Sequence, residues 1–237
     1  MVIQSSEPVR PRPVSNGMRE IIPTVVPQSF DDVVAAKNRY SGFATQLHVD
    51  ATDGTFTSGR TWSPMSGEKL PDAQTLFYEA HLMINNPLSV GVAFARSGAK
   101  RLIGHVEAFH NAESARETFD MWQKAGVTEI SVAILLDTPL QELRPFIPLI
   151  DSVLVMTIEK IGKQGASFDE RALARIQEIH ARYPDIIIAS DGGVSSKNVD
   201  ALESAGATRF CIGSALAKAK DPAKTYAQLC GAVEVVK

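Results

Sequence analysis

The segment Leu47-His48-Val49-Asp50-Ala51-Thr52-Asp53-Gly54 places a histidine and a carboxylate at the end of an otherwise apolar run. Side chains alternate between the two faces of a strand, so His48 and Asp50 point to one side while Leu47 and Val49 point to the other. A charge that is buried on one side of a strand needs a partner. The segment therefore predicts that polar residues from other strands meet it there.

Similar polar residues end two more predicted strands. One is Tyr78-Glu79-Ala80-His81-Leu82-Met83 and the other is Ala189-Ser190-Asp191-Gly192-Gly193. In a parallel (β/α)₈ barrel all strand ends converge on one mouth, so that residues distant in the sequence become neighbours. A doubly wound open sheet would collect its site at one switch point, and no GxGxxG motif follows the first predicted strand. The pattern favours an α/β protein with a (β/α)₈ (TIM) barrel.

The rest of the chain supports this fold, because eight short apolar runs alternate with longer amphipathic segments. The predicted strands cover residues 20–26, 44–50, 75–84, 101–106, 129–136, 152–157, 186–190 and 209–212. The predicted helices cover residues 30–40, 87–97, 112–125, 140–146, 169–183, 195–205 and 223–233. Between the second and third strands, residues 55–71 are rich in Gly, Ser, Thr and Pro, which disfavours a helix. We expect one barrel domain over residues 19–237, after a flexible, proline-containing tail over residues 1–18.

The composition excludes several classes of protein. The chain has 237 residues, 44% of them hydrophobic, and its 24 basic and 27 acidic residues give a net charge of -3. No stretch concentrates Lys or Arg enough to neutralise many phosphates, which argues against a nucleic-acid partner. The apolar runs, such as residues 132–136, are far shorter than the roughly 18 residues of a membrane span. Cys211 and Cys230 do not form a CxxC pair, which fits a reducing compartment. We expect a cytoplasmic protein that binds neither nucleic acid nor membrane.

The four residues His48, Asp50, His81 and Asp191 form a mixed nitrogen and oxygen ligand set. Taken singly, each has an ordinary interpretation, as a hydrogen-bonded core histidine or as an aspartate in a turn. Together they are explained by one divalent ion at the mouth of the barrel. Such a set suits Zn²⁺ or Fe²⁺, with Mn²⁺ and Co²⁺ as alternatives, better than Mg²⁺ or Ca²⁺.

Small residues follow the last two predicted strands, at Gly192 and Gly193 and at Gly213 and Ser214. Backbone N–H groups in such loops can approach an anion closely, and barrels commonly bind phosphate in the loops after strands seven and eight. The alternative is that the glycines only turn the chain. The pairing of both loops favours a phosphorylated substrate.

Several segments, in this order, resemble the ribulose-phosphate 3-epimerase family from about residue 21 to residue 219: HVDATDG, HLM, VLVMT and SDGGVSSKNV. The resemblance implies a metal-dependent barrel of the ribulose-phosphate-binding type. It places the metal ligands on His48, Asp50, His81 and Asp191, and the two acid/base carboxylates on Asp50 and Asp191. Substrate contacts are implied at Thr24, His48, His81, Met83, Met156, Gly162, Gly165, Gly192, Gly193, Gly213 and Ser214.

The sequence departs from the family pattern in three places. Thr52 replaces a methionine that lines the site, and Leu135-Leu136 replaces an Asn-Pro pair. Residues 159–168 replace the family's EPGFGGQ loop, with two lysines, Lys160 and Lys163, that could meet a phosphate or simply lie in solvent. The metal and proton-transfer residues are therefore better preserved than the segments that shape the substrate site.

The resemblance implies epimerisation at carbon 3 of a ketose phosphate, converting D-ribulose 5-phosphate to D-xylulose 5-phosphate by two-carboxylate proton transfer through a metal-stabilised enediolate. Two alternatives stay open. The altered loop and Thr52 could admit a hexulose 6-phosphate such as allulose 6-phosphate, or the protein could be a catalytically silent relative that binds a sugar phosphate. Retention of all four ligand residues favours an enzyme. A homo-oligomer is compatible with the sequence, because barrels of this kind often associate through helix faces.

Overall fold

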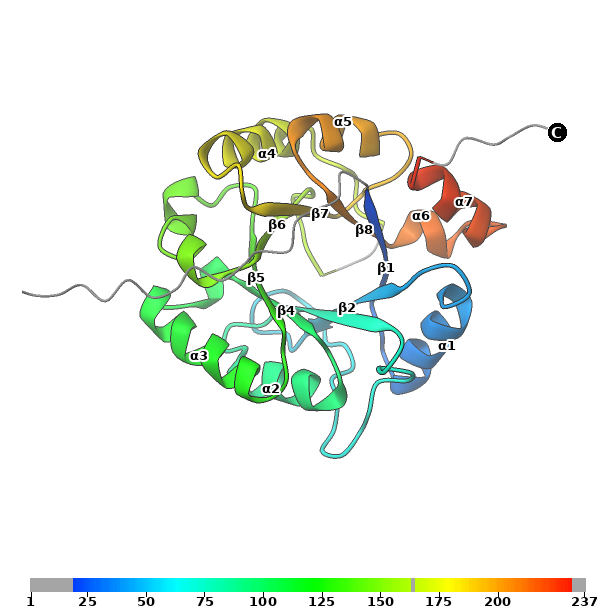
Figure 1. Cartoon of the computed structure of the whole chain (residues 1–237), viewed down its shortest axis with the longest axis horizontal. Coiled ribbons are helices and arrows are strands. Elements are labelled where there is room, and N and C mark those ends of the chain that lie inside the picture. The colour runs from blue at the N-terminus through cyan, green and yellow to red at the C-terminus, as the bar shows by residue number, and fades with distance from the viewer. Residues whose placement is uncertain (1–18, 163–164, 232–237) are drawn as a thin grey trace, which may run out of the picture.

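Eight parallel strands close into a barrel, and each strand pairs with its neighbours in the sequence while the first pairs with the last. The computed structural model describes residues 19–162 and 165–231. Figure 1 shows the strands at the centre with the helices around them. The strands are β1 (Glu20–Val25), β2 (Gln46–Thr52), β3 (Phe77–Met83), β4 (Arg101–His105), β5 (Glu129–Ile134), β6 (Ser152–Met156), β7 (Ile187–Asp191) and β8 (Arg209–Ile212). The predicted barrel is confirmed.

The connections after most strands contain a helix that packs on the outside of the barrel (Figure 1). The α-helices are α1 (Phe30–Tyr40), α2 (Leu88–Ser97), α3 (Ala112–Lys124), α4 (Arg171–Arg182), α5 (Val199–Ala205), α6 (Ser214–Ala217) and α7 (Pro222–Leu229). Side chains cap the start of three of them, with Ser29, Asn111 and Asp221 accepting hydrogen bonds from backbone N–H groups of the first turn. Among the described residues, no helix is long and apolar enough to cross a membrane.

The helix predicted over residues 140–146 is wrong. Two short 3₁₀ helices, η2 (Leu140–Leu143) and η3 (Ile147–Leu149), occupy this connection instead, and a third, η1 (Val106–Ala108), follows β4. Pro145 and Pro148 each lack the N–H that a continuing α-helix would need. The predicted helix over residues 195–205 is also shorter, beginning at Val199, because residues 195–198 form a turn in which the Ser195 N–H donates to Asn198 Oδ1.

The structure adds one short helix, α6, which the sequence analysis did not predict. The predicted tail over residues 1–18 and the end of the predicted helix over residues 223–233 lie outside the described residues.

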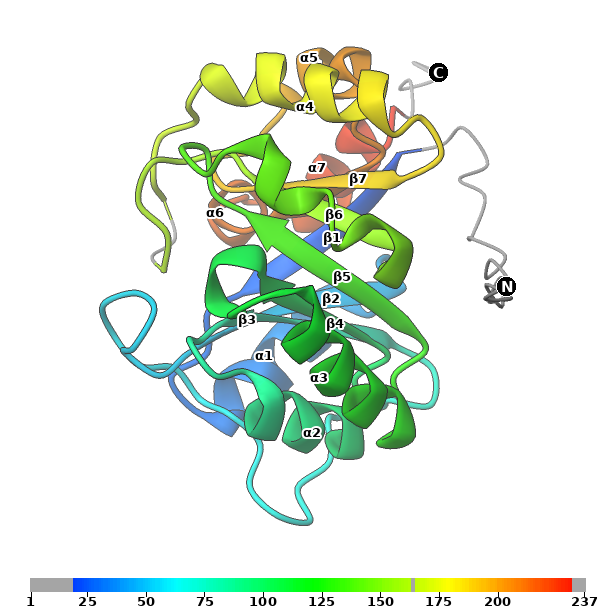
Figure 2. The ribbon, with the colours of Figure 1, turned by 90° about the vertical axis from the view of Figure 1, so that its left-hand side faces the viewer.

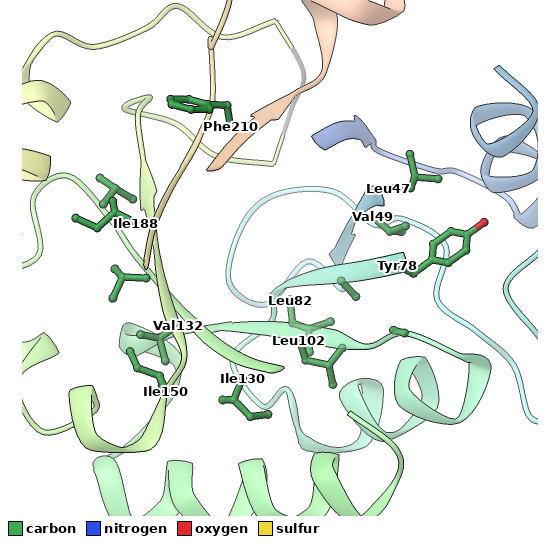
Figure 3. Packing of buried hydrophobic residues seen from close by; sticks show 14 of the residues in the cluster. Leu47, Val49, Tyr78, Leu82, Leu102, Ile130, Val132, Ile150, Ile188 and Phe210 are labelled. Atoms are coloured by element: carbon green, nitrogen blue, oxygen red, sulfur yellow. The ribbon is translucent and has the colours of Figure 1, made fainter. Parts of the chain in front are cut away.

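The main hydrophobic core lies between the barrel and the helices. Outward-facing strand residues such as Leu47, Val49 and Leu102 are fully buried there, together with Trp122 of α3. Figure 3 shows members of this cluster contributed by neighbouring strands. Full burial of one such aliphatic side chain contributes roughly 1.5–3 kcal/mol. The burial of Leu47 and Val49 confirms the predicted alternation in β2 and leaves His48 and Asp50 to face the barrel interior.

The barrel interior holds a layer of charged residues, which we call the ionic layer: the buried Glu79, Arg101, Glu129 and Arg209, and the partly exposed Glu20. Arg101 pairs with Glu79 and, through Nη2 at 2.8 Å, with Glu129. Arg209 pairs with Glu129 and, through Nε at 2.7 Å, with Glu20. Four of the five residues begin their strands, so the layer lies at the end of the barrel opposite to the loops that follow the strands.

Two long connections lie together at the other end of the barrel. Figure 2 shows the loop after β2 (cyan) and the loop after β6 (yellow-green) on the side toward which the β5 arrow points. Thr57 Oγ1 donates a hydrogen bond of 2.9 Å to the Ile161 carbonyl, which joins the two loops directly. This end of the barrel holds the candidate site.

Candidate metal and active site

Four side chains that are distant in the sequence meet inside the barrel: His48 and Asp50 of β2, His81 of β3 and Asp191 of β7. Asp50 Oδ1 lies 3.1 Å from both His48 Nε2 and His81 Nδ1. Asp191 Oδ2 lies 3.8 Å from His81 Nδ1. The structure therefore brings together all four residues that the sequence singled out as metal ligands.

The geometry of these four side chains fits a metal ion. Their ligand atoms all lie within 4.8 Å of one another. Ligands placed tetrahedrally about 2.1 Å from a zinc ion lie about 3.4 Å apart, so an ion would fit between these atoms with small side-chain shifts. Both imidazoles are fully buried. Nitrogen and carboxylate donors in this arrangement suit a divalent transition metal.

Each histidine is also held from behind by a further polar residue. His48 Nδ1 lies 2.5 Å from Glu79 Oε1, and His81 Nε2 lies 2.8 Å from His105 Nε2. Glu79 is almost completely buried, yet Arg101 and His48 hold its pKa well below the ordinary value against the opposing effect of burial. The sequence analysis missed Glu79 as part of the site. Its place two residues before His81 was the available signal, since both side chains face the same side of β3.

The two carboxylates have opposite pKa shifts. Burial and the neighbouring Asp50 carboxylate raise the pKa of Asp191 to about 6. Burial also acts to raise the pKa of Asp50, but hydrogen bonds with His48 and His81 outweigh it and hold that pKa well below the ordinary value. A pair of carboxyl groups whose environments separate their pKa values can supply one proton acceptor and one proton donor.

A cavity opens above the four side chains. Asp50 and Asp191 reach it, whereas His48 and His81 lie fully buried beneath it. The predicted substrate contacts that line it are Thr24, Met83, Met156, Gly162, Gly165, Gly192, Gly193, Gly213 and Ser214. Lining residues that the sequence analysis did not predict are Ile158, Ala166, Val194 and Cys211.

The two residues after β7 must be glycines for two reasons: their φ values are positive, and the loop after β6 packs too closely against them to leave room for a side chain. Gly192 and Gly193 have φ values of 111° and 65°, in the region that side chains rarely adopt. A Cβ on Gly192 would lie 2.7 Å from Ile158 Cγ1, and one on Gly193 would lie 2.6 Å from the Phe168 backbone nitrogen. The loop after β6 therefore rests directly on the loop after β7, along one wall of the cavity.

The residues that depart from the family pattern have different places. Thr52 does not line the cavity; its hydroxyl donates to the Gly59 carbonyl at 2.9 Å and its N–H donates to Thr61 Oγ1, which fixes the loop after β2. Lys160 is exposed and is not a lining residue, and Lys163 lies outside the described residues. His105 of β4 is fully buried behind His81.

Sequence comparisons find similar enzymes that match most of this chain. A ribulose-phosphate 3-epimerase of Schizosaccharomyces pombe is 29% identical over 218 residues, which cover 90% of this chain and 93% of that protein. The enzyme of the same name from Chlamydia trachomatis is 33% identical over 178 residues, which cover 73% of this chain and 74% of that protein.

Among solved structures, a 3-keto-L-gulonate-6-phosphate decarboxylase from Vibrio cholerae superposes with a TM-score of 0.65 at 14% identity, covering 90% of this chain and 95% of that one, which shows a shared fold. A sequence model described as the ribulose-phosphate 3 epimerase family matches residues 21–217. On this match and the similarity to the curated enzymes, the chain belongs to the ribulose-phosphate 3-epimerase family.

Proposed function

We propose that the protein is a metal-dependent epimerase that inverts carbon 3 of D-ribulose 5-phosphate to give D-xylulose 5-phosphate. The observation that carries the proposal is the pair Asp50 and Asp191, which reach one cavity from β2 and β7 and have pKa values shifted in opposite directions. The family membership supplies the substrate class.

In this proposal the two carboxylates move the proton. One of them takes the proton from carbon 3, and the electron pair left behind moves onto the carbonyl oxygen at carbon 2. The other returns a proton to carbon 3 from the opposite face, which inverts the centre, and the roles exchange in the reverse direction. The opposite pKa shifts of Asp50 and Asp191 suit a pair in which one group starts ionised and the other protonated.

A divalent transition metal held by His48, Asp50, His81 and Asp191 would supply Lewis-acid stabilisation of the negative charge that develops on the substrate oxygens. Met83 and Met156 present polarizable, apolar walls to the cavity and exclude water from the reacting atoms. The backbone around Gly192, Gly193, Gly213 and Ser214 would bind the phosphate through N–H groups.

The substrate assignment is tested by proton exchange at carbon 3 in deuterated buffer. We expect exchange and conversion with D-ribulose 5-phosphate to be faster than with allulose 6-phosphate, because the cavity is closed on one side by the loop after β6 resting on Gly193. Faster conversion of the hexulose would make the protein a hexulose-6-phosphate 3-epimerase. Binding of both without any exchange would identify it as a silent relative.

The metal assignment is tested by elemental analysis of the purified protein. We expect about one transition-metal ion per chain, with zinc or iron before manganese or cobalt, since the cluster of two imidazoles and two carboxylates would hold one ion. The measurement is inductively coupled plasma mass spectrometry, with protein in which His48 and His81 are both replaced by alanine as the control. Full activity after exhaustive chelation would contradict the assignment.

A further inference from the structure

Behind His81, on the side away from the cavity, two further polar side chains follow in a hydrogen-bonded series: His105 and then Glu107. His81 Nε2 lies 2.8 Å from His105 Nε2, and His105 Nδ1 lies 3.2 Å from Glu107 Oε2. Both imidazoles are fully buried, and the Phe56 ring covers His105 at a centroid distance of 4.6 Å. Behind His81, the hydrogen bonds of the two rings are made with each other and with Glu107, while His81 Nδ1 faces Asp50 on the other side.

The hydrogen bonds at the Glu107 end of this series have a fixed donor and acceptor. Glu107 Oε1 accepts a hydrogen bond from the Leu135 backbone N–H at 2.9 Å and another from the Thr138 hydroxyl. A backbone N–H can only donate, so an oxygen atom must stand at this position. The other carboxylate oxygen of Glu107 is left to accept from His105 Nδ1, which must therefore carry a hydrogen.

The positions of the remaining hydrogens follow from this. A neutral imidazole that carries its hydrogen on Nδ1 has a lone pair on Nε2, so His105 Nε2 accepts and His81 Nε2 donates. With a metal ion bound, His81 then carries its single hydrogen on Nε2 and directs its lone pair on Nδ1 toward the ion. Without the ion, Nδ1 can also carry a hydrogen and donate it to Asp50 Oδ1. Nδ1 is the atom that faces Asp50 Oδ1 at 3.1 Å and Asp191 Oδ2 at 3.8 Å.

We propose that His105 and Glu107 are positioning residues that hold His81 in the tautomer whose Nδ1 lone pair faces the metal. The inference rests on the metal site of the proposed function and adds two residues that act through His81 without touching substrate or metal. His48 has a shorter equivalent, because its Nδ1 faces Glu79 Oε1 directly at 2.5 Å. Each histidine ligand is thus oriented by a carboxylate, His48 by direct contact and His81 through one intervening imidazole.

The sharpest test is the substitution Glu107→Gln, which keeps the shape of the side chain. The Leu135 N–H still requires an oxygen, so the amide must turn its NH₂ group toward His105 Nδ1. His105 Nδ1 then accepts, its hydrogen moves to Nε2, and His81 must accept on Nε2 and carry its hydrogen on Nδ1. This hydrogen occupies the position where the metal would bind.

We expect Glu107→Gln to weaken zinc binding about 10–100-fold, the range typical for loss of such an outer hydrogen-bond partner. Zinc affinity is measured by competition with a chromophoric chelator. The matched control is Glu178→Gln on α4, whose partner is the exposed Arg182, and its zinc affinity should equal that of the unsubstituted protein. Ring ¹⁵N chemical shifts of the metal-free proteins give a second readout, and the hydrogen on His105 should move from Nδ1 to Nε2 in Glu107→Gln alone.

A second pair of variants distinguishes a positioning role of His105 from a role in packing alone. The same pair tests the inference if Glu107→Gln does not fold. His105→Gln keeps an acceptor near the position of Nε2 and should retain most of the zinc affinity, whereas His105→Leu removes it and should lose affinity. Equal affinity in His105→Leu and His105→Gln would overturn the inference but not the proposed metal site. Unchanged affinity together with an unchanged His105 tautomer in Glu107→Gln would do the same. Absence of zinc binding by the unsubstituted protein would instead overturn the proposed metal site, and the inference with it.

Discussion

Replacing Asp50 or Asp191 by asparagine should lower the turnover of D-ribulose 5-phosphate by several orders of magnitude while the barrel stays folded. A positioned proton-transfer group contributes about 10²–10⁴-fold to a rate, and each of these carboxylates is also one of the four proposed metal ligands. Asparagine has nearly the same size, so the buried surroundings of either residue change little. The measurement is kcat in a coupled assay that detects xylulose 5-phosphate, with circular dichroism to confirm the fold.

The control for this prediction is Asp120→Asn, which makes the same chemical change at an exposed position on α3 and should leave kcat unchanged. Hydrogen exchange gives an additional, directional result. If the carboxylates act on opposite faces, each variant should retain slow exchange at carbon 3 for one epimer only, and the epimer should differ between the two variants. Near-normal epimerisation by either variant would refute the two-carboxylate mechanism.

Replacing Arg101 by methionine should lower the free energy of unfolding by about 3–5 kcal/mol, the range for removing one partner from a buried ion pair. The Arg101 side chain is only 4% exposed and neutralises Glu79, whose side chain is 2% exposed. Without Arg101 the Glu79 carboxylate keeps His48 as its near neighbour but loses its buried countercharge. The measurement is urea unfolding of the metal-free proteins, so that metal binding does not add to the difference.

The matched control is Arg182→Met, which removes an arginine from an exposed pair with Glu178 on α4 and should change the free energy of unfolding by at most about 0.5 kcal/mol. Adding Glu79→Gln to Arg101→Met should recover part of the lost stability, because the uncompensated charge is then gone. A loss in Arg101→Met no greater than in Arg182→Met would show that the ionic layer is not needed to balance these charges.

The barrel, the family and the class of enzyme, an isomerase, were predictable from the sequence because each depends on local pattern. Alternation in residues 47–50 separates the buried hydrophobic face from the polar one, and the fold then brings Asp191 to His81. The specific roles of these residues stay predictions, as do the metal, the domain limits and the oligomeric state.

What the sequence analysis missed depends on contacts across the barrel. Arg101 and Arg209 look like ordinary charged residues at strand starts, and Glu79 like one within a strand. Only the closed barrel turns the three inward together. The segment 140–146 has a helix-like apolar pattern, but the missing N–H groups of Pro145 and Pro148 decide its local structure. Thr52 was expected to alter the site wall, whereas its hydroxyl is bound to the backbone of its own loop.

Closure of the barrel also bears on the order of events during synthesis. The Glu20–Arg209 pair joins the first and last strands across 189 positions of sequence, so no ribosome-bound chain can complete the cylinder before β8 has emerged. Three of the four proposed metal ligands lie on β2 and β3, while Asp191 is made more than a hundred residues later. Such long-range closure slows folding. From the synthesis of His81 to that of Asp191 the nascent protein therefore carries an incomplete set of the proposed ligands, and the complete set is present only late in synthesis.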